Sequence, residues 1–181
     1  DSLVELCEAA GNGWDQPKGG QGNGPVGIWC HDSKGVTIRR CVAHHNKSTS
    51  GDGGGFDFDG GTRDSVFEYN YSYENYSSGF LIWEYGSEHP IKHNVIRYNV
   101  SVNDREGGIR MGISGGQPIQ DLDIHHNTVI NTRWPCVNLQ GSWASGKFEE
   151  AGGLKDVRIH DNILIGPKGG ELVKGKGDVT F

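Results

Sequence analysis

One short phrase recurs through the chain at a nearly constant spacing, and this repeat limits the folds that the sequence can adopt. Each strong copy centres on an apolar anchor, and the anchors are Ile38, Phe67, Ile96, Ile124 and Ile159, separated by 29, 29, 28 and 35 residues. A weaker copy at 4–7 begins 34 residues before Ile38, so that six copies cover nearly the whole chain. Repeats of this length indicate a solenoid in which each repeat forms one coil.

Two files of turn residues accompany the anchors. Three residues after each anchor the chain carries Cys7, Cys41, Asn70, Asn99, Asn127 and Asn162. Five residues later it carries Asn12, Asn46, Asn75, Asp104, Thr132 and Pro167. Asn and Asp tolerate the left-handed backbone and hydrogen-bond their own turn. Their recurrence at one phase predicts corners that are repeated from coil to coil.

A second phrase alternates with the first and predicts another set of short strands, at 27–31, 55–59, 79–83, 108–112 and 136–140. Apolar residues recur here at every second position, and the spacers are rich in Gly, Ser, Asn and Asp, which excludes a helical reading. No single coil can bury its inner face, whereas stacked coils can do so with strands about 4.8 Å apart. The sequence therefore predicts an all-β, single-stranded parallel β-helix of about six coils.

Composition narrows the range of partners. The 181 residues include 30 Gly and one Met, and the net charge of −6 without a long basic run argues against nucleic acid and anionic membranes. No apolar segment approaches the roughly 20 residues of a membrane helix. The chain opens on Asp1 without an initiator Met or a signal peptide, as a processed or excised product would, and we expect a secreted protein.

The repeat, the Asn file and the strand openings together resemble the right-handed parallel β-helix proteins of the pectin-lyase-like superfamily over residues 1–181. The resemblance implies a single β-helix domain, which is either complete or a fragment of a longer β-helix. It leaves the function open, because the superfamily includes lyases, glycoside hydrolases, epimerases, phage tail-spikes and adhesins.

Stacking the second phrases predicts two outward rows on one sheet. The first row is Trp29, Asp57, Leu81, Arg110 and Asn138, and the second is His31, Asp59, Trp83, Gly112 and Gln140. Aromatic rings stack on sugars and planar polar groups bind hydroxyls, so we expect a polysaccharide to bind here. The predicted binding residues are Trp29, Trp83, Asn138, Gln140 and, in the insertion at 134–153, Trp143. The alternative is an ordinary solvated face.

The acidic pair Asp57 and Asp59 suggests glycoside hydrolysis. The two residues share one face of a strand, so they lie about 7 Å apart, and inverting hydrolases use carboxyl groups about 6.5–9.5 Å apart. His31 is expected to orient Asp59, and Glu84 is a third acidic candidate at the end of its strand.

A second chemistry is β-elimination of a polysaccharide that contains uronic acid, in which a base removes a proton and a cation neutralises the carboxylate. Asp52, Asp57 and Asp59 would hold Ca²⁺ as oxygen ligands. Arg110 resembles an arginine that many lyases of the superfamily place on the same sheet, and would be the base or the clamp. Elimination is the leading prediction, with hydrolysis and non-catalytic glycan binding or adhesion as alternatives.

The remaining histidines and cysteines are expected to be structural. Five histidines fall at corners or outward positions and are predicted to be solvated, not metal ligands, because no carboxylate sits beside them in a facial pattern: His44, His45, His125, His126 and His160. The cysteines lack a metal-like spacing. Cys7 and Cys41 share a phase in adjacent coils, but parallel side chains rarely give the disulfide torsion, so free thiols are expected. We expect a monomer or part of a longer chain.

Overall fold

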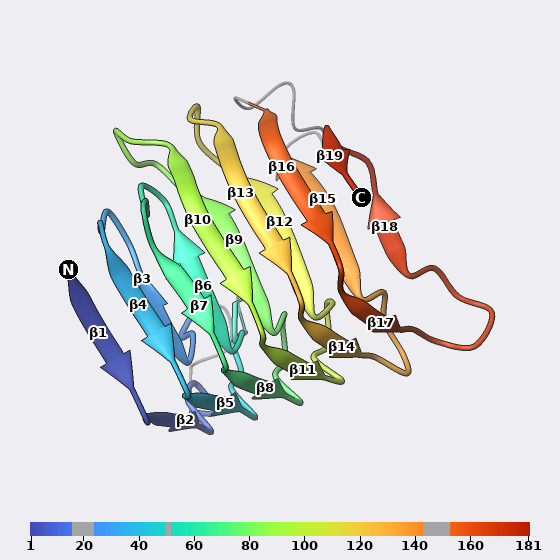
Figure 1. The fold of residues 1–181 in the computed structure, drawn as a ribbon. Coiled ribbons are helices and arrows are strands. Elements are labelled where there is room, and N and C mark those ends of the chain that lie inside the picture. The colour runs from blue at the N-terminus through green and yellow to red at the C-terminus, as the bar shows by residue number, and fades with distance from the viewer. Residues whose placement is uncertain (16–23, 50–51, 143–152) are drawn as a thin grey trace.

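The computed structural model describes residues 1–15, 24–49, 52–142 and 153–181, and in them the chain winds as a parallel β-helix with three faces (Figure 1). Every strand pairing is parallel, and each coil gives one strand to each of three sheets. The order of the strands in each sheet follows the order of the coils, so strands about 30 residues apart in sequence lie side by side. The prediction of an all-β solenoid of about six coils is confirmed for the described residues.

The first sheet contains β1 (Ser2–Glu5), β4 (Val36–Arg39), β7 (Val66–Glu68), β10 (Ile91–Arg97), β13 (Ile119–His125), β16 (Leu154–His160) and β19 (Val179–Thr180). The second contains β2 (Glu8–Ala10), β5 (Val42–His44), β8 (Tyr71–Tyr73), β11 (Val100–Val102), β14 (Thr128–Ile130) and β17 (Ile163–Ile165). The third contains β3 (Ile28–Cys30), β6 (Phe56–Asp59), β9 (Phe80–Glu84), β12 (Ile109–Ile113), β15 (Val137–Ser142) and β18 (Val173–Gly175). The described residues include no helix that could cross a membrane.

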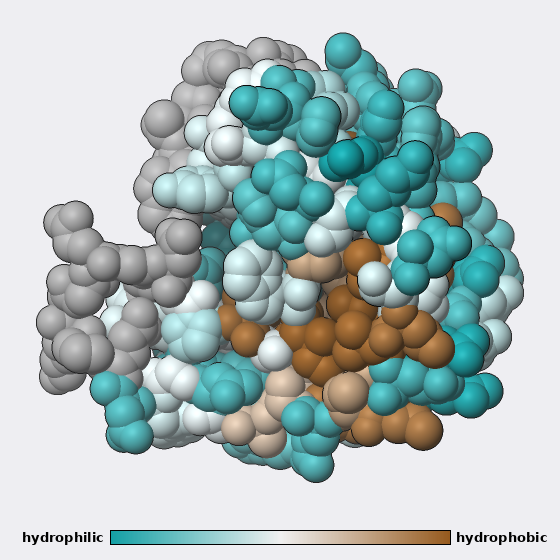
Figure 2. Space-filling model, turned by 90° about the vertical axis from the view of Figure 1, so that its left-hand side faces the viewer, coloured by the Kyte–Doolittle hydropathy of each residue, from teal (hydrophilic) through white to brown (hydrophobic). Residues whose placement is uncertain are grey.

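The core is built from files of like side chains that run along the axis. The five strong anchors of the first sheet are each at most 3% exposed and occupy matching positions in β4, β7, β10, β13 and β16. The third sheet adds a file in which the rings of Phe56 and Phe80 stack at 5.1 Å. Figure 2 looks onto the end formed by β1 to β3, where apolar surface gathers and Leu3 and Leu6 are exposed.

The corner between the first and second sheets is closed by an amide ladder. The residue before each ladder position has a left-handed backbone, with φ between 52° and 58° at Leu6, Arg40, Tyr69, Tyr98, His126 and Asp161. This turn points each Asn side chain inward, where Asn70 Nδ2 donates to Asn99 Oδ1 at 3.0 Å and Asn99 Nδ2 donates to Asn127 Oδ1 at 3.0 Å. Each rung therefore satisfies buried backbone groups of its neighbours.

The ladder begins at two cysteines in place of Asn. Cys7 and Cys41 are free thiols, as expected, and the backbone N–H of Cys7 donates to Cys41 Sγ at 3.5 Å. Cys30 and Cys136 are also free and buried.

A second ladder closes the corner between the second and third sheets, and two of the residues predicted for this position, Thr132 and Pro167, do not join it. Asn12, Asn46, Asn75 and Asp104 are bonded rung to rung as expected. The next coil uses Asn131, whose Nδ2 donates to the Asp104 carbonyl at 2.7 Å, whereas Thr132 is exposed. The corner is one residue shorter here, so the ladder residue comes one position earlier than the regular spacing of the sequence predicts. Pro167 instead opens a turn that is closed by the N–H of Gly170 at 2.9 Å.

Asp104 is the one carboxylate among the bonded members of this ladder, and we expect its replacement by an amide to stabilise the fold at neutral pH. Burial raises the pKa of Asp104 to about 6, against hydrogen bonds from Ser101 and Asn75 that lower it. The folded chain therefore binds more protons than the unfolded chain between about pH 4 and 6, and stability falls as the pH rises through this window. Asp104→Asn should raise the free energy of unfolding at pH 7 by up to about 3 kcal/mol. The gain should vanish below about pH 4 in urea titrations.

The preceding coil already carries an Asn, Asn75, at the ladder position of Asp104. Asn75 Nδ2 donates to Ser72 Oγ at 3.0 Å, and Asp104 lies in the same relation to Ser101, whose hydroxyl donates to Asp104 Oδ2 at 2.6 Å. The new amide can thus be accommodated by rotation of one hydroxyl. Equal stability of Asp104→Asn and the parent chain at pH 7 would contradict the assignment.

Candidate functional site

The candidate site lies on the outer face of the third sheet, and the strand register brings together the first predicted row. Trp29 pairs with Asp57, Asp57 with Leu81, Leu81 with Arg110, and Arg110 with Asn138. In the second row Asp59 pairs with Trp83 and Trp83 with Gly112. His31 follows β3 directly, and the N–H of Asp32 continues the ladder to the Gly60 carbonyl at 2.8 Å.

Asp57 is a carboxyl group buried without a complete set of partners. The residue is 5% exposed, and its Oδ1 atom has no hydrogen-bond partner among the described residues. Burial, followed by the charges of Asp59 and Asp52, raises its pKa well above the ordinary value, whereas the charge of Arg110 acts in the opposite direction. A carboxyl group in this state favours its protonated form, as a general acid requires.

Two further carboxyl groups lie near Asp57 and are less buried. Asp59 accepts a hydrogen bond from the N–H of Gly60 at 2.8 Å, and Asp52 accepts one from the N–H of Gly24 at 2.7 Å. Burial raises the pKa of both carboxyl groups, and the nearby charge of His31 lowers that of Asp59. His31 Nδ1 itself lies 3.5 Å from Asp32 Oδ2, and its predicted role in orienting Asp59 stays a prediction.

Arg110 is held in a network that the sequence did not reveal. Its guanidinium donates to Glu106 Oε2, to Ser77 Oγ at 2.9 Å, and to Gln140 Oε1, with Nε at 2.8 Å from the last. Burial lowers its pKa, and the charge of Glu106 counteracts this effect. Arg110 is only 5% exposed, and the Glu106 carboxylate already neutralises its charge. The cation that was expected to clamp a substrate carboxylate therefore has a partner within the protein.

Gln140 is shifted from its expected position by a bulge. The register changes between Met111 and Gly112, so that Gly112 pairs with Gly141, where the backbone is left-handed with φ of 77°. The extra residue turns the side chain of Gln140 to Arg110 and away from the row of Asp59. Asn138, also predicted to bind sugar, donates from Nδ2 to the Glu106 carbonyl at 3.0 Å.

The two predicted tryptophan platforms differ in accessibility. Trp29 is 53% exposed at the start of the row that contains Asp57. The Trp83 ring lies over Gly112, where a Cβ atom would stand 2.1 Å from ring atom Cζ3, and its Nε1 donates to Ser114 Oγ at 2.8 Å. The Arg110 guanidinium lies 5.1 Å from the Trp83 ring centre. Trp83 therefore packs against Gly112 and Arg110 and helps to hold the site, whereas Trp29 is the more accessible of the two indoles.

Glu84 does not join the outer carboxyl groups. It follows Phe80 and Ile82 in the inward phase of β9, and it is fully buried beside the backbone of Gly115. Neither Oε atom of Glu84 has a hydrogen-bond partner of good geometry in the described residues. Burial raises the pKa of Glu84, and the nearby backbone amide of Ser87 lowers it. Side chains alternate along a strand, so Glu84 does not share the outer face of Asp57 and Asp59, and its role as a third acidic candidate stays a prediction. Leu81 was expected to face solvent but is 2% exposed.

Two predictions about ligands stay open. No group of three or more His, Cys, Asp or Glu in the described parts of the chain is arranged to hold a metal ion, and Ca²⁺ at Asp52, Asp57 and Asp59 stays a prediction. Trp143 lies outside the described residues.

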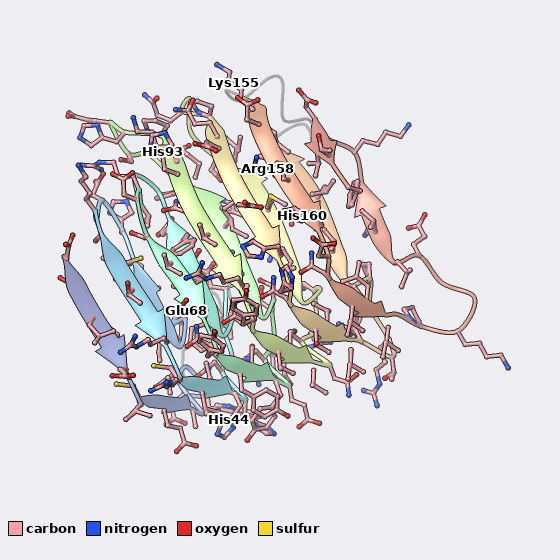
Figure 3. All side chains as sticks on the ribbon, in the orientation of Figure 1. His44, Glu68, His93, Lys155, Arg158 and His160 are labelled. Atoms are coloured by element: carbon pink, nitrogen blue, oxygen red, sulfur yellow. The ribbon has the colours of Figure 1, made fainter. Side chains whose placement is uncertain are left out.

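A separate groove of about 550 Å³ lies on the outer face of the first sheet, away from Asp57 (Figure 3). It is lined by side chains of both charges and by polar side chains: His93, Gln120, Asp121, Lys155, Asp156, Arg158 and Thr180. None of the described residues that line it is a Trp, Tyr or Phe, whereas the third sheet presents the exposed Trp29.

Comparison with known proteins defines the class. Residues 7–181 match the family model of the right-handed β-helix region, and the chain belongs to this family. No curated protein and no solved structure matches the chain. The family is compatible with carbohydrate-active and with adhesive roles, and the choice between them depends on the site itself.

Proposed function

We propose that this protein is a carbohydrate-active β-helix that hydrolyses glycosidic bonds with the carboxyl pair Asp57 and Asp59. The observation that carries the proposal is the buried Asp57 carboxyl group, with an unpartnered oxygen and a raised pKa, beside a more exposed carboxyl group on the same strand. An unpartnered buried oxygen costs about 1–3 kcal/mol, and a fold that tolerates this cost at a surface row is typical of a functional site.

The two carboxyl groups suit different roles. Asp57 is the more buried and would protonate the leaving oxygen, whereas Asp59 would activate a water molecule on the other side of the sugar ring. Two residues that are two positions apart on a strand lie about 7 Å apart, which is within the roughly 6.5–9.5 Å range of inverting enzymes. Trp29, exposed in the same row, would stack on a pyranose ring.

β-Elimination, the leading prediction from sequence, is the second candidate. It requires a positive charge opposite the uronate, and Arg110 is already paired with Glu106. The observation that favours it is the proximity of three carboxyl groups that would attract Ca²⁺: the charges of Asp59 and Asp52 raise the pKa of Asp57, and that of Asp52 raises the pKa of Asp59. In this mechanism the Ca²⁺ ion would supply the positive charge that the uronate carboxylate requires. We further propose that the protein is secreted, acts on an extracellular polysaccharide as a monomer or as part of a longer chain, and binds neither nucleic acid nor membrane.

Product analysis separates these proposals. The protein is incubated with a panel of neutral and uronate-containing polysaccharides, with Ca²⁺ or with a chelator. Hydrolysis predicts new reducing ends of inverted anomeric configuration by NMR, without the ultraviolet absorbance of an unsaturated product. Calcium-dependent absorbance would instead establish elimination. Binding without either product would establish a non-catalytic glycan-binding protein and contradict the hydrolase proposal.

A further inference from the structure

Two consecutive histidines at the corner after β5 form a couple that is independent of the carboxyl site. His44 ends β5 in extended conformation, and His45 has a left-handed backbone with φ of 54°. Consecutive side chains diverge in a strand, but this turn brings both rings to one side. Their planes are inclined at 86°, and the two Nδ1 atoms approach to 2.7 Å.

The far nitrogen of each ring is bound by a carboxylate. His44 Nε2 lies 2.9 Å from Glu8 Oε1, and His45 Nε2 lies 2.9 Å from Glu74 Oε2. A carboxylate oxygen can only accept, so both Nε2 atoms carry hydrogen, and in neutral rings both Nδ1 atoms then present lone pairs. Two lone pairs that face each other at this distance repel, and either a proton on one nitrogen or a metal ion bound by both nitrogens removes the repulsion.

The geometry points to a site for a divalent transition metal ion between His44 Nδ1 and His45 Nδ1. Histidine ligands of metals usually donate their other N–H to a carboxylate, which fixes the tautomer and raises the basicity of the ring, and Glu8 and Glu74 occupy these positions. Neutral imidazole suits zinc, copper and nickel. The sequence did not reveal these two carboxylates, which come from the neighbouring coils.

The couple needs only a small movement to accept an ion. Zinc binds imidazole nitrogen at about 2.0–2.1 Å, so two adjacent ligands stand roughly 3 Å apart. Tyr73 supports the site, because its ring stacks on His44 at 4.5 Å and at an angle of 9°. The side chain of His44 is 17% exposed and that of His45 is 46% exposed, which leaves the remaining coordination positions to water (Figure 3 labels His44).

The chain contains a natural comparison at the other corner, between the first and second sheets. His125 and His126 also bring their Nδ1 atoms to 2.7 Å, with rings inclined at 85°. In the described residues, however, neither of their Nε2 atoms forms an ion pair with a carboxylate, so one Nδ1 can keep its hydrogen and donate to the other. The two couples differ in the carboxylates and should differ in metal affinity.

The test is isothermal titration of the untagged protein with zinc chloride at neutral pH. His45→Asn is the matched variant, because Asn103 occupies the equivalent left-handed position two coils later, also with φ of 54°. We expect one site whose affinity falls at least tenfold in His45→Asn and about 10–100-fold in Glu74→Gln. His126→Asn should leave it unchanged.

Three results would overturn the site. The first is the absence of zinc binding by the parent chain, which would mean that the couple holds only a proton. The second is a loss of affinity in His126→Asn without a loss in His45→Asn. The third is unaltered affinity in His45→Asn with an unaltered melting temperature. None of these results bears on the hydrolase proposal, because the couple belongs to the second sheet and Asp57 to the third.

Discussion

Asp57→Asn should lower kcat/KM for glycan cleavage by about 10²–10⁴-fold while making the fold more stable at pH 7. The loss is that of a general acid, since an amide cannot protonate the leaving oxygen. The gain follows from burial, because the pKa of Asp57 is raised in the folded state. The folded chain then binds more protons than the unfolded chain above about pH 4, and removing the charge removes a cost that grows with pH.

The measurement combines initial rates with urea unfolding at pH 7 and at about pH 4. We expect the free energy of unfolding to rise by roughly 1–3 kcal/mol at pH 7 and to change less at about pH 4, where the folded state is protonated and the unfolded state is about half protonated. Asp104→Asn is the control, since it also removes a buried carboxylate but lies in the corner ladder, and it should leave the rate unchanged. An active or a destabilised Asp57→Asn protein at pH 7 would exclude Asp57 as the acid.

Asn99→Ala should have the largest effect on stability, about 3–5 kcal/mol. Asn99 Oδ1 accepts from the backbone N–H of Asn70 at 2.9 Å and from Asn70 Nδ2 at 3.0 Å. Its own Nδ2 donates to the Phe67 carbonyl at 2.9 Å and to Asn127 Oδ1 at 3.0 Å. The variant loses four buried hydrogen bonds, each worth about 1 kcal/mol on average and more where a donor stays unpaired.

Urea unfolding of Asn99→Ala beside Asn162→Ala tests this ladder. Asn162 is the last Asn of the file and bonds a side-chain neighbour on one side only, with its Oδ1 accepting from Asn127 Nδ2 at 3.0 Å. Asn162 also accepts from the backbone N–H of Asn127 at 2.8 Å and donates to the Ile124 and His160 carbonyls, but it is only half-buried. Water can replace these partners, so its removal should cost less than that of Asn99. If the two substitutions cost the same, the ladder does not transmit stability from coil to coil as the hydrogen bonds indicate.

The sequence predicts most of the fold, because the repeat sets both the register and the corners. The row from Trp29 to Asn138 follows from one periodicity, and the backbone pairing reproduces it. A third ladder escaped notice, in which the N–H of Ser65 donates to Asn94 Oδ1 at 2.9 Å. The backbone N–H of Val36 in turn donates to Ser65 Oγ at 3.0 Å, so the side-chain acceptors are one Ser and one Asn, which do not form a visible file of like residues in the sequence.

The site was less predictable, for reasons that differ between residues. Glu84 could have been rejected from the sequence, since it stands four positions after the inward Phe80. The bulge that moves Gln140 had a weak signal in Gly141, a glycine inside a strand. No sequence signal pointed to Glu106, because it lies in a turn without periodicity and its ion pair with Arg110 depends on the local backbone conformation. The burial of Asp57 depends on packing around the row, which no spacing encodes.

Carbon-13 NMR of the side-chain carboxyl groups tests the central claim most directly. In a protein labelled at aspartate, the resonance that disappears in Asp57→Asn should titrate well above the ordinary range of aspartate, and that of Asp59 should titrate at a lower pH. This result would place a protonated acid beside a carboxylate on the third sheet. Titration of the Asp57 carboxyl group near pH 4, as in an exposed aspartate, would contradict the account.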